Sequence, residues 1–261
     1  MSNQIVAYGC GSPIRLQIVQ ALATGSAANA FVPNANPTYR GGDSIVWGLI
    51  RGAHEIMQQT RQNGCDYFQI DNAYFGRNKY FRVTPNALQL THMPKAVIDD
   101  RYQFIFKMLG KSIMPWRKER NGPIVICPSS EFLYRFYGTT LEAWIQSVCL
   151  EIKKYTDRQI AVRYKELMPK DDIDEAIQDA WCVVTHVSAA ALDALRLGVP
   201  VITTGECAAS PLATTISEIE NPRLNDGREA LFSLLANCQF TPEEMLKNNV
   251  LPVVKLLSKT N

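Results

Sequence analysis

The chain has 261 residues, of which 46% are apolar, and this is enough for a buried core in one large or two small domains. No run of about 18 apolar residues occurs, which excludes a membrane-spanning helix, and the seven cysteines show no C-x-x-C spacing, which argues against zinc ribbons and redox motifs. Because the amino terminus also lacks the pattern of a signal peptide, we expect a cytoplasmic protein with free thiols.

The small net charge of +2 conceals an uneven distribution along the chain. Residues 1–122 carry 14 Lys and Arg against 7 Asp and Glu, whereas residues 123–261 carry 13 against 18. A basic half followed by an acidic half suggests that the two halves meet different partners, although ordinary surface variation would give the same numbers.

The first half alternates less regularly than the second. Its apolar patterns and glycine turns predict a strand over 4–9, a helix over 13–25 begun by Pro13, a strand over 43–50, a helix over 51–64, a strand over 66–74 and an extended segment over 78–88. The polar, basic and proline-containing segment 113–123 is the candidate linker.

The second half alternates strand and helix. The predicted strands are 123–128, 158–164, 182–186 and 199–205, and the predicted helices are 140–155, 171–180, 188–198, 226–238 and 241–249. This alternation is typical of right-handed βαβ units. We therefore predict an α/β protein that contains parallel sheet.

Polar segments follow four of the predicted strands, namely "PSSE" (128–131), "YKE" (164–166), "THVS" (185–188) and "TTGE" (203–206). Ligands of open parallel sheets bind beyond the carboxyl ends of the strands, so these segments would line one crevice. Ser188 suits an N-cap, and the small residues behind it would let an anion such as a diphosphate approach the backbone N–H groups of the next helix. His186 could donate to a phosphate or a sugar hydroxyl, and a capped structural helix is the alternative.

The segment "VVTHVSAAALDALRLGVPVITTG" resembles the donor site of bacterial capsule-polysaccharide and Kdo-type glycosyltransferases, and the resemblance extends over about 120–210. It implies a compact GT-B-like fold, in which two Rossmann-like parallel-sheet domains face a cleft, with an acceptor-binding domain over 1–118 and a nucleotide-sugar-binding domain over 119–261. It also implies transfer of a sugar from a nucleotide sugar, with no metal and no other cofactor. In that family a Lys-x-His-Pro segment contacts phosphate, but this chain has "RYKELMP", so Arg163 or Lys165 would take that role. The implied donor-binding residues are Ser129, Ser130, Arg163, Lys165, Thr185, His186, Ser188, Ala189 and Glu206. Asp172 and Asp174 form no clear Asp-x-Asp metal site and are interpreted as a solvated helix start.

A transferase needs a base that takes the proton of the acceptor hydroxyl. Asp71 is the first candidate because it ends an apolar strand, and Asp43 is the second because it follows two glycines; His186 completes the catalytic set, and His54 and His92 are weaker candidates. The turn with Gly9 and Gly11 lacks the third glycine of a dinucleotide fingerprint, so we predict a tight turn beside the substrate and not NAD binding.

Segment 74–95 interleaves aromatic and cationic residues, a composition that suits a phosphate backbone with stackable bases. The predicted acceptor-binding residues are Gly9, Gly11, Arg77, Lys79, Tyr80 and Arg82. The design is similar to that of phage enzymes that glycosylate hydroxymethylated DNA bases, which would make a modified DNA base the acceptor. The alternatives are a surface or capsule polysaccharide as acceptor, a sugar-nucleotide epimerase, or a non-catalytic nucleotide- or nucleic-acid-binding protein. The same pattern would also arise if the aromatic side chains of this segment were buried in the core and its charged side chains were solvated.

Overall fold

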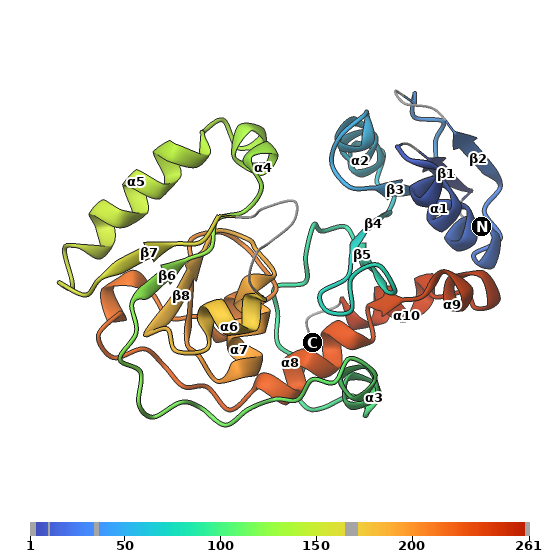
Figure 1. Cartoon of the computed structure of the whole chain (residues 1–261). Coiled ribbons are helices and arrows are strands. Elements are labelled where there is room, and N and C mark those ends of the chain that lie inside the picture. The colour runs from blue at the N-terminus through green and yellow to red at the C-terminus, as the bar shows by residue number, and fades with distance from the viewer. Residues whose placement is uncertain (1–3, 10, 34–36, 165–171, 259–261) are drawn as a thin grey trace. The chain divides into compact units, whose positions relative to one another are not determined.

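The computed structural model describes residues 4–9, 11–33, 37–164 and 172–258. The chain divides into two units, of which unit 1 comprises residues 1–90 and 233–261 and unit 2 comprises residues 91–232 (Figure 1). Both units are mixed α/β structures that contain parallel sheet. Among the described residues, none of the helices combines the length and the apolar character needed to cross a membrane.

Unit 1 is built on a six-stranded sheet with the order β10-β5-β4-β3-β1-β2. Its strands are β1 (Ile5–Gly9), β2 (Ala30–Pro33), β3 (Asp43–Trp47), β4 (Tyr67–Asn72), β5 (Phe81–Pro85) and β10 (Gln239–Phe240). The strands β2, β1, β3 and β4 are parallel, whereas β5 pairs antiparallel with β4 and β10 antiparallel with β5. The sheet is therefore mixed and not parallel throughout. The segment between β4 and β5 is too short for a crossover helix, so the chain returns in the opposite direction.

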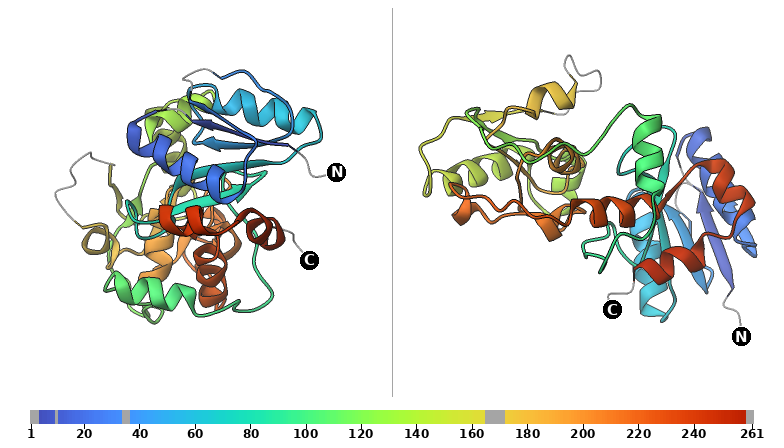
Figure 2. Two further views of the ribbon diagram at one scale, coloured as in Figure 1. Left: turned by 90° about the vertical axis from the view of Figure 1, so that its right-hand side faces the viewer. Right: turned by 90° about the horizontal axis from the view of Figure 1, so that it is seen from below.

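Four helices belong wholly to unit 1: α1 (Pro13–Gly25), α2 (Ala53–Gln62), α9 (Pro242–Lys247) and α10 (Leu251–Leu257). Helix α9 packs against α1 and α10 packs against β5, so the carboxyl-terminal segment lies with the amino-terminal strands (Figure 2). The apolar faces of β1, β3 and α2 form a core around Val6, Tyr8, Val46 and Ile56.

Unit 2 has a four-stranded parallel sheet with the order β7-β6-β8-β9. Its elements are β6 (Ile124–Ile126), β7 (Ile160–Val162), β8 (Cys182–Thr185), β9 (Val201–Thr203), α3 (Arg101–Met108), α4 (Glu131–Phe136), α5 (Leu141–Ile152), α6 (Ile173–Ile177) and α7 (Ala190–Leu197). Short 3-10 turns follow β9 at Ser210–Leu212 and Ile216–Glu218, and α8 (Arg228–Ala236) leads back into unit 1. The core lies around Ile126, Trp144, Val184 and Ile202.

The chain enters unit 2 near residue 91 and leaves it within α8, whereas we expected one boundary at residue 118. The expected linker 113–123 lies inside unit 2 and runs beside the end of α7. There the Met114 N–H donates to the Arg196 carbonyl at 2.7 Å, and the Arg117 N–H donates to the Gly198 carbonyl at 3.0 Å. Residues after 232 belong to unit 1 because β10 pairs with β5, a long-range contact that local sequence patterns do not contain.

Candidate functional site

The carboxyl ends of all four strands of unit 2 meet at one edge of its sheet, because the strands are parallel. This edge carries the residues expected to bind the donor, namely Ser129 and Ser130 after β6, Arg163 after β7, Thr185 at the end of β8 with His186, Ser188 and Ala189 after it, and Glu206 after β9. Lys165 lies outside the described residues. Ligands of such sheets bind at this edge.

The bend after β8 is built on the hydroxyl of Thr185, which is fully buried. This hydroxyl donates to the Cys127 carbonyl at 2.5 Å and accepts from the Ser188 N–H at 3.3 Å. Because both bonds are internal, Thr185 shapes the bend and has no surface to offer a ligand.

A second hydroxyl joins the ends of β6 and β8. The Val187 N–H donates to the Ser129 hydroxyl at 3.1 Å, and the Ser129 N–H donates to the Tyr134 hydroxyl at 3.0 Å. Ser129 is itself buried, whereas Ser130, the N-cap residue of α4, is exposed. Only Ser130 of this pair reaches solvent.

Helix α7 begins one residue later than its sequence suggests, with Ala189 as N-cap residue. The Ser188 hydroxyl accepts from the Ala190 N–H at 3.3 Å. The amides of Val187, Ser188 and Ala190 are therefore all bonded to hydroxyls, although we expected the first-turn amides of this helix, such as that of Ala190, to be free. Within the described residues, the amides of His186 and Ala189 are the ones in this bend that show no hydrogen bond, so an anion would not meet a row of free helix amides.

The His186 ring lies in an aromatic cluster. It stacks on Tyr134 with centroids 5.8 Å apart and 28° between the planes, and it meets Tyr137 edge-on at 5.4 Å. Gly205 is required beside it, because a Cβ there would lie 2.5 Å from His186 Cε1. His186 Nδ1 is 3.0 Å from Thr204 Oγ1, which also accepts from Trp144 Nε1 at 3.0 Å.

Burial lowers the pKa of His186, and its hydrogen bond with Thr204 opposes this only partly. The imidazole is therefore neutral at neutral pH, with one nitrogen that accepts and one that donates a hydrogen bond. A neutral ring of this kind can bind a hydroxyl or a phosphate oxygen through a single N–H.

Two charged side chains lie at this edge of the sheet. The charge of Arg163 acts on Cys127, although burial dominates there and raises the pKa of that thiol to about 12. Burial also raises the pKa of Tyr137, and the carboxylate of Glu206 adds to this effect. Arg163 thus contributes a cation at the end of β7, and Glu206 an anion near the aromatic cluster.

A groove of about 510 Å³ adjoins Thr204, and sequence reasoning missed it. Hydroxyl-bearing residues dominate its lining, namely Tyr155, Thr203, Thr204, Ser210, Thr214, Thr215 and Ser217, together with Glu151. The density of Ser and Thr after β9 was the available signal. Its donors and acceptors match the hydroxyls of a sugar or ribose.

Asp71 lies near the carboxyl end of β4 in unit 1, directly opposite Arg82 on β5. Its carboxylate pairs with the Arg82 guanidinium at 2.9 Å and accepts from the Asn72 N–H at 2.7 Å. Arg82 is largely buried and lies over the Tyr74 ring, so it positions Asp71 and has little surface for a ligand.

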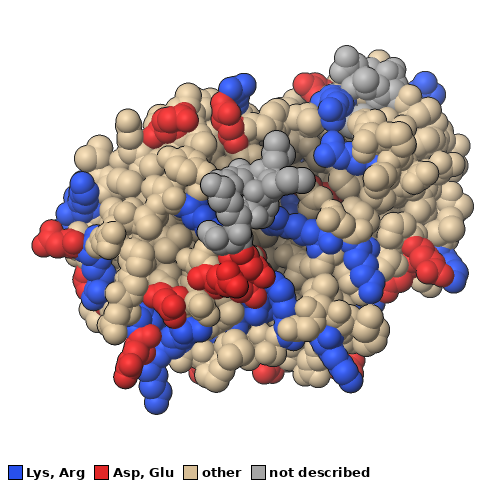
Figure 3. Space-filling view, viewed as in Figure 1, with Lys and Arg blue, Asp and Glu red and all other residues tan. Residues whose placement is uncertain are grey.

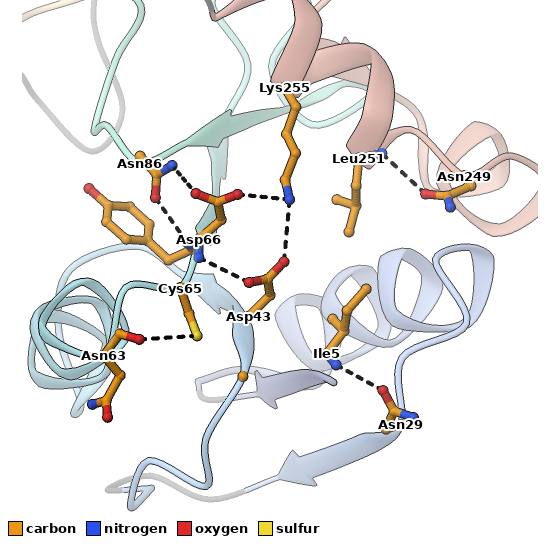
Figure 4. A network of polar contacts seen from close by, with 12 residues as sticks. Ile5, Asn29, Asp43, Asn63, Cys65, Asp66, Asn86, Asn249, Leu251 and Lys255 are labelled. Carbon is orange, nitrogen blue, oxygen red and sulfur yellow. Dashed lines mark hydrogen bonds and ion pairs between the residues drawn. The ribbon is translucent and has the colours of Figure 1, made fainter. Parts of the chain in front are cut away.

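Asp43 lies at the amino end of β3, away from the edge where ligands of parallel sheets bind. It is buried and accepts from the Asp66 N–H at 3.0 Å, while Lys255 Nζ lies 3.3 Å from Asp43 and 2.8 Å from Asp66 (Figure 4). The Asn86 side chain donates to Asp66 at 2.6 Å. These closed contacts favour a structural role for Asp43.

The aromatic residues of segment 74–95 are core residues. Tyr74, Phe75, Tyr80 and Phe81 are all buried in unit 1, so none presents a ring on which a base could stack. Arg77 and Lys79 are exposed. Figure 3 shows both signs of charge on the face in view. The segment therefore lacks the exposed rings that the nucleic-acid interpretation requires for base stacking.

The other candidate residues of unit 1 are dispersed. Gly9 is a packing position, since a Cβ there would lie 2.8 Å from both Leu16 and Phe31, whereas Gly11 has a positive φ of 103°. His54, in α2, and His92, in unit 2, are both half-buried. No group of three His, Cys, Asp or Glu residues is placed to hold a metal ion within the part of the chain that the structure describes.

The sequence matches no protein-family model, and a comparison with curated proteins finds no relative. The solved structures that are similar to almost the whole chain include the two that follow. Thermosulfurimonas dismutans KpsC, a beta Kdo 2,4 transferase, is 12% identical with a TM-score of 0.56, covering 99% of each chain. The beta Kdo 2,7 transferase of the same KpsC is 13% identical with a TM-score of 0.58, covering 97% of this chain and 99% of the other. At such identities the likeness establishes the fold.

Proposed function

We propose that this chain is a glycosyltransferase of the two-domain, GT-B-like type, in which unit 2 binds a nucleotide-sugar donor and unit 1 binds the acceptor. The observation that carries the proposal is the single polar edge of unit 2, where hydrogen bonds join the ends of β6, β8 and β9. The fold supports it, because both similar structures bear the names of transferases and are matched over almost their full length.

In unit 2 the leaving nucleotide would be held by the Ala189 amide at the start of α7 and by the Arg163 guanidinium. The neutral His186 ring and Ser130 would donate to phosphate or sugar oxygens, and the hydroxyl-lined groove beside Thr204 would take the ribose or the sugar. Glu206 suits sugar hydroxyls, because its carboxylate would repel phosphate. These groups would carry the charge of the leaving group without a metal ion.

In unit 1 the Asp71 carboxylate would act as general base. The acceptor oxygen forms a bond to the anomeric carbon, the bond from that carbon to the phosphate oxygen breaks, and the nucleotide leaves with the electron pair. The acceptor proton passes to Asp71. Arg82 orients this carboxylate through their 2.9 Å contact.

A surface or capsule glycan is the acceptor class that the structure favours over DNA, because the four aromatic rings of segment 74–95 are buried. We expect only weak, salt-sensitive binding to duplexes with hydroxymethylated bases, driven by exposed cations such as Arg77 and Lys79. Tight binding that survives physiological salt would restore the DNA acceptor.

Calorimetric titration with CMP-, UDP-, GDP- and TDP-sugars tests donor binding, and nucleotide release in the presence of glycan acceptors tests transfer. We expect one nucleotide class to bind. The double variant His186→Ala with Ser188→Ala should weaken its affinity at least tenfold, while Ser147→Ala, an exposed serine of α5, should leave it unchanged. Unchanged donor affinity in the double variant would remove this edge as the donor site.

Asp71→Asn separates catalysis from binding. It should lower turnover by 10²-fold or more, in line with the usual contribution of a general base, and leave donor affinity within twofold. Full activity in this variant would exclude Asp71 as base. Donor binding without any nucleotide release in the wild type would instead indicate a non-catalytic binding protein.

A further inference from the structure

The loops that follow β1 and β3 lie together in unit 1, because these two strands are parallel neighbours. Both loops have unusual backbone conformations: φ is +103° at Gly11 after β1, and +63°, +57° and +81° at Gly48, Arg51 and Gly52 after β3. Arg51 is the informative residue of this set. A non-glycine residue in the left-handed region is strained, and such strain often accompanies a functional position.

The side chains of Arg15 and Arg51 converge on Gly11. A Cβ built on Gly11 would lie 3.5 Å from Arg15 Nη1, 3.5 Å from Arg51 Nη1 and 3.1 Å from Arg15 Cδ, and these are its three nearest atoms. The Arg15 guanidinium also lies over the Trp47 ring, 5.6 Å from its centroid. Trp47 is buried and ends β3, so it fixes the direction in which Arg15 points.

Among the described residues, no carboxylate balances the two guanidinium groups. Across residues 4–9, 11–33, 37–164 and 172–258, neither Arg15 nor Arg51 forms an ion pair. The first turn of α1, which follows Gly11, contains no acidic residue. Two cations that reach the same point repel each other, and an anion placed between them would convert this repulsion into attraction.

We propose that Arg15 and Arg51 hold an oxyanion, a carboxylate or a phosphate, over Gly11. A guanidinium presents paired N–H donors that match the oxygens of either group, and a glycine keeps the approach to these donors open. The site lies at the carboxyl edge of the sheet of unit 1, where ligands of parallel strands bind. One part of this proposal rests on the proposed function, namely that the bound ligand is the acceptor. The acceptor would then carry an acidic group.

The test is a titration of the full chain at low ionic strength, with inorganic phosphate in one series and glucuronate in the other. Binding is followed through the guanidinium N–H signals of Arg15 and Arg51 in NMR spectra. We expect saturable shifts of both residues, and the tighter of the two probes identifies the acidic group as phosphate or carboxylate. Shifts that do not saturate with either probe would overturn the site.

Three variants sharpen this test, and their folding is checked by thermal melts. Arg51→Gln and Arg15→Gln should each weaken binding at least tenfold, whereas Arg61→Gln, which removes an exposed arginine of α2, should change it less than twofold. Equal losses in all three variants would mean that only net charge matters, which contradicts a built site. The Arg15 variant keeps the test decisive if the Arg51 variant does not fold.

Donor calorimetry distinguishes the failure of this site from the failure of the proposed function. If phosphate or glucuronate binds through Arg15 and Arg51 while no nucleotide sugar binds, the oxyanion site stands and the transferase proposal fails. If transfer proceeds and both arginine variants bind the probes like the wild type, the oxyanion site is refuted and the transferase proposal stands.

Discussion

Two polar networks lie at opposite kinds of sheet edge and differ in chemistry. In unit 1, Asp43, Asp66 and Lys255 form a charged network at the amino end of β3. In unit 2, the hydroxyls of Ser129, Thr185 and Thr204 connect neutral groups at the carboxyl ends of the strands. The first network satisfies its charges internally, whereas the second leaves the His186 ring and the Ala189 amide able to bond to something else.

This difference gives two criteria for distinguishing a structural polar cluster from a candidate binding site. Position along the strand and remaining hydrogen-bonding capacity separate the two better than residue type does. Asp43 and Asp71 are both strand carboxylates, yet only Asp71 lies at the edge where parallel sheets bind ligands. The predictions below test whether the unit 1 network serves stability and the unit 2 network serves binding.

The largest expected effect comes from Lys255→Met, which leaves buried Asp43 without its cation. Removing one partner of a buried pair costs about 3–5 kcal/mol, and the partial exposure of Lys255 reduces this to about 2 kcal/mol. Thermal melts should show Tm lower by about 4–8 °C, with donor affinity unchanged. Lys247→Met, which breaks an exposed ion pair with Glu243 on α9, should leave Tm nearly unchanged. Equal effects of the two variants would contradict a structural network.

Thr185→Val should have an intermediate effect on stability and also weaken donor binding. Valine has the shape of threonine but leaves the Ser188 N–H and the Cys127 carbonyl without their partner, at a cost of about 1 kcal/mol. We expect Tm to fall by about 2–4 °C in melts, and donor affinity to fall in calorimetry because the bend loosens. Thr139→Val, at a half-buried threonine outside this bend, is the matched control. A loss of stability with full donor affinity would separate this bend from the binding site.

The smallest expected effects are two pH dependences in different windows. Burial would raise the pKa of Asp66, but hydrogen bonds from Lys255 and Asn86 outweigh it and hold this pKa low. Its contribution to stability is therefore present above about pH 4 and is lost as pH falls through the lowered pKa. The lowered pKa of His186 makes stability fall as pH drops below about 6.5.

Melts from pH 8 to pH 3 check both windows. Asp66→Asn should flatten the acid arm below about pH 4, and His186→Gln should flatten the shallower slope below about pH 6.5. Glu55→Gln, an exposed change on α2, should leave both slopes as they are. If the two variants altered the same window, the assignment of a charged network to unit 1 and a neutral one to unit 2 would be wrong.

The sequence predicted the parallel sheet of unit 2 well, because apolar runs there alternate with helical patterns along the chain. The bounds of α1 and the end of α7 at Gly198 were also predicted correctly. β10 was missed because two residues carry no periodic signal and its partner β5 is distant in the chain. The positions of the polar segments after the strands followed from a general rule for such sheets.

Burial was the property that local patterns could not supply. The rings of Tyr74, Phe75, Tyr80 and Phe81 alternate with cations in a way that fits a nucleic-acid surface, yet all four are buried. Arg82 was expected at the surface and instead pairs with Asp71 across two strands. Arg51 was not considered at all, because its relation to Arg15 exists only once β1 and β3 are adjacent.

The return of residues 233–258 to unit 1 has a consequence for synthesis on the ribosome. Unit 2 is one continuous stretch of chain and can fold once residue 232 has left the ribosome. In unit 1, β5 cannot pair with β10, and α1 cannot pack against α9, until the carboxyl-terminal residues have been synthesised. The first ninety residues are thus translated early, but unit 1 completes its fold only after the carboxyl-terminal residues are available. We expect this delay to make the nascent amino-terminal strands a substrate for chaperones.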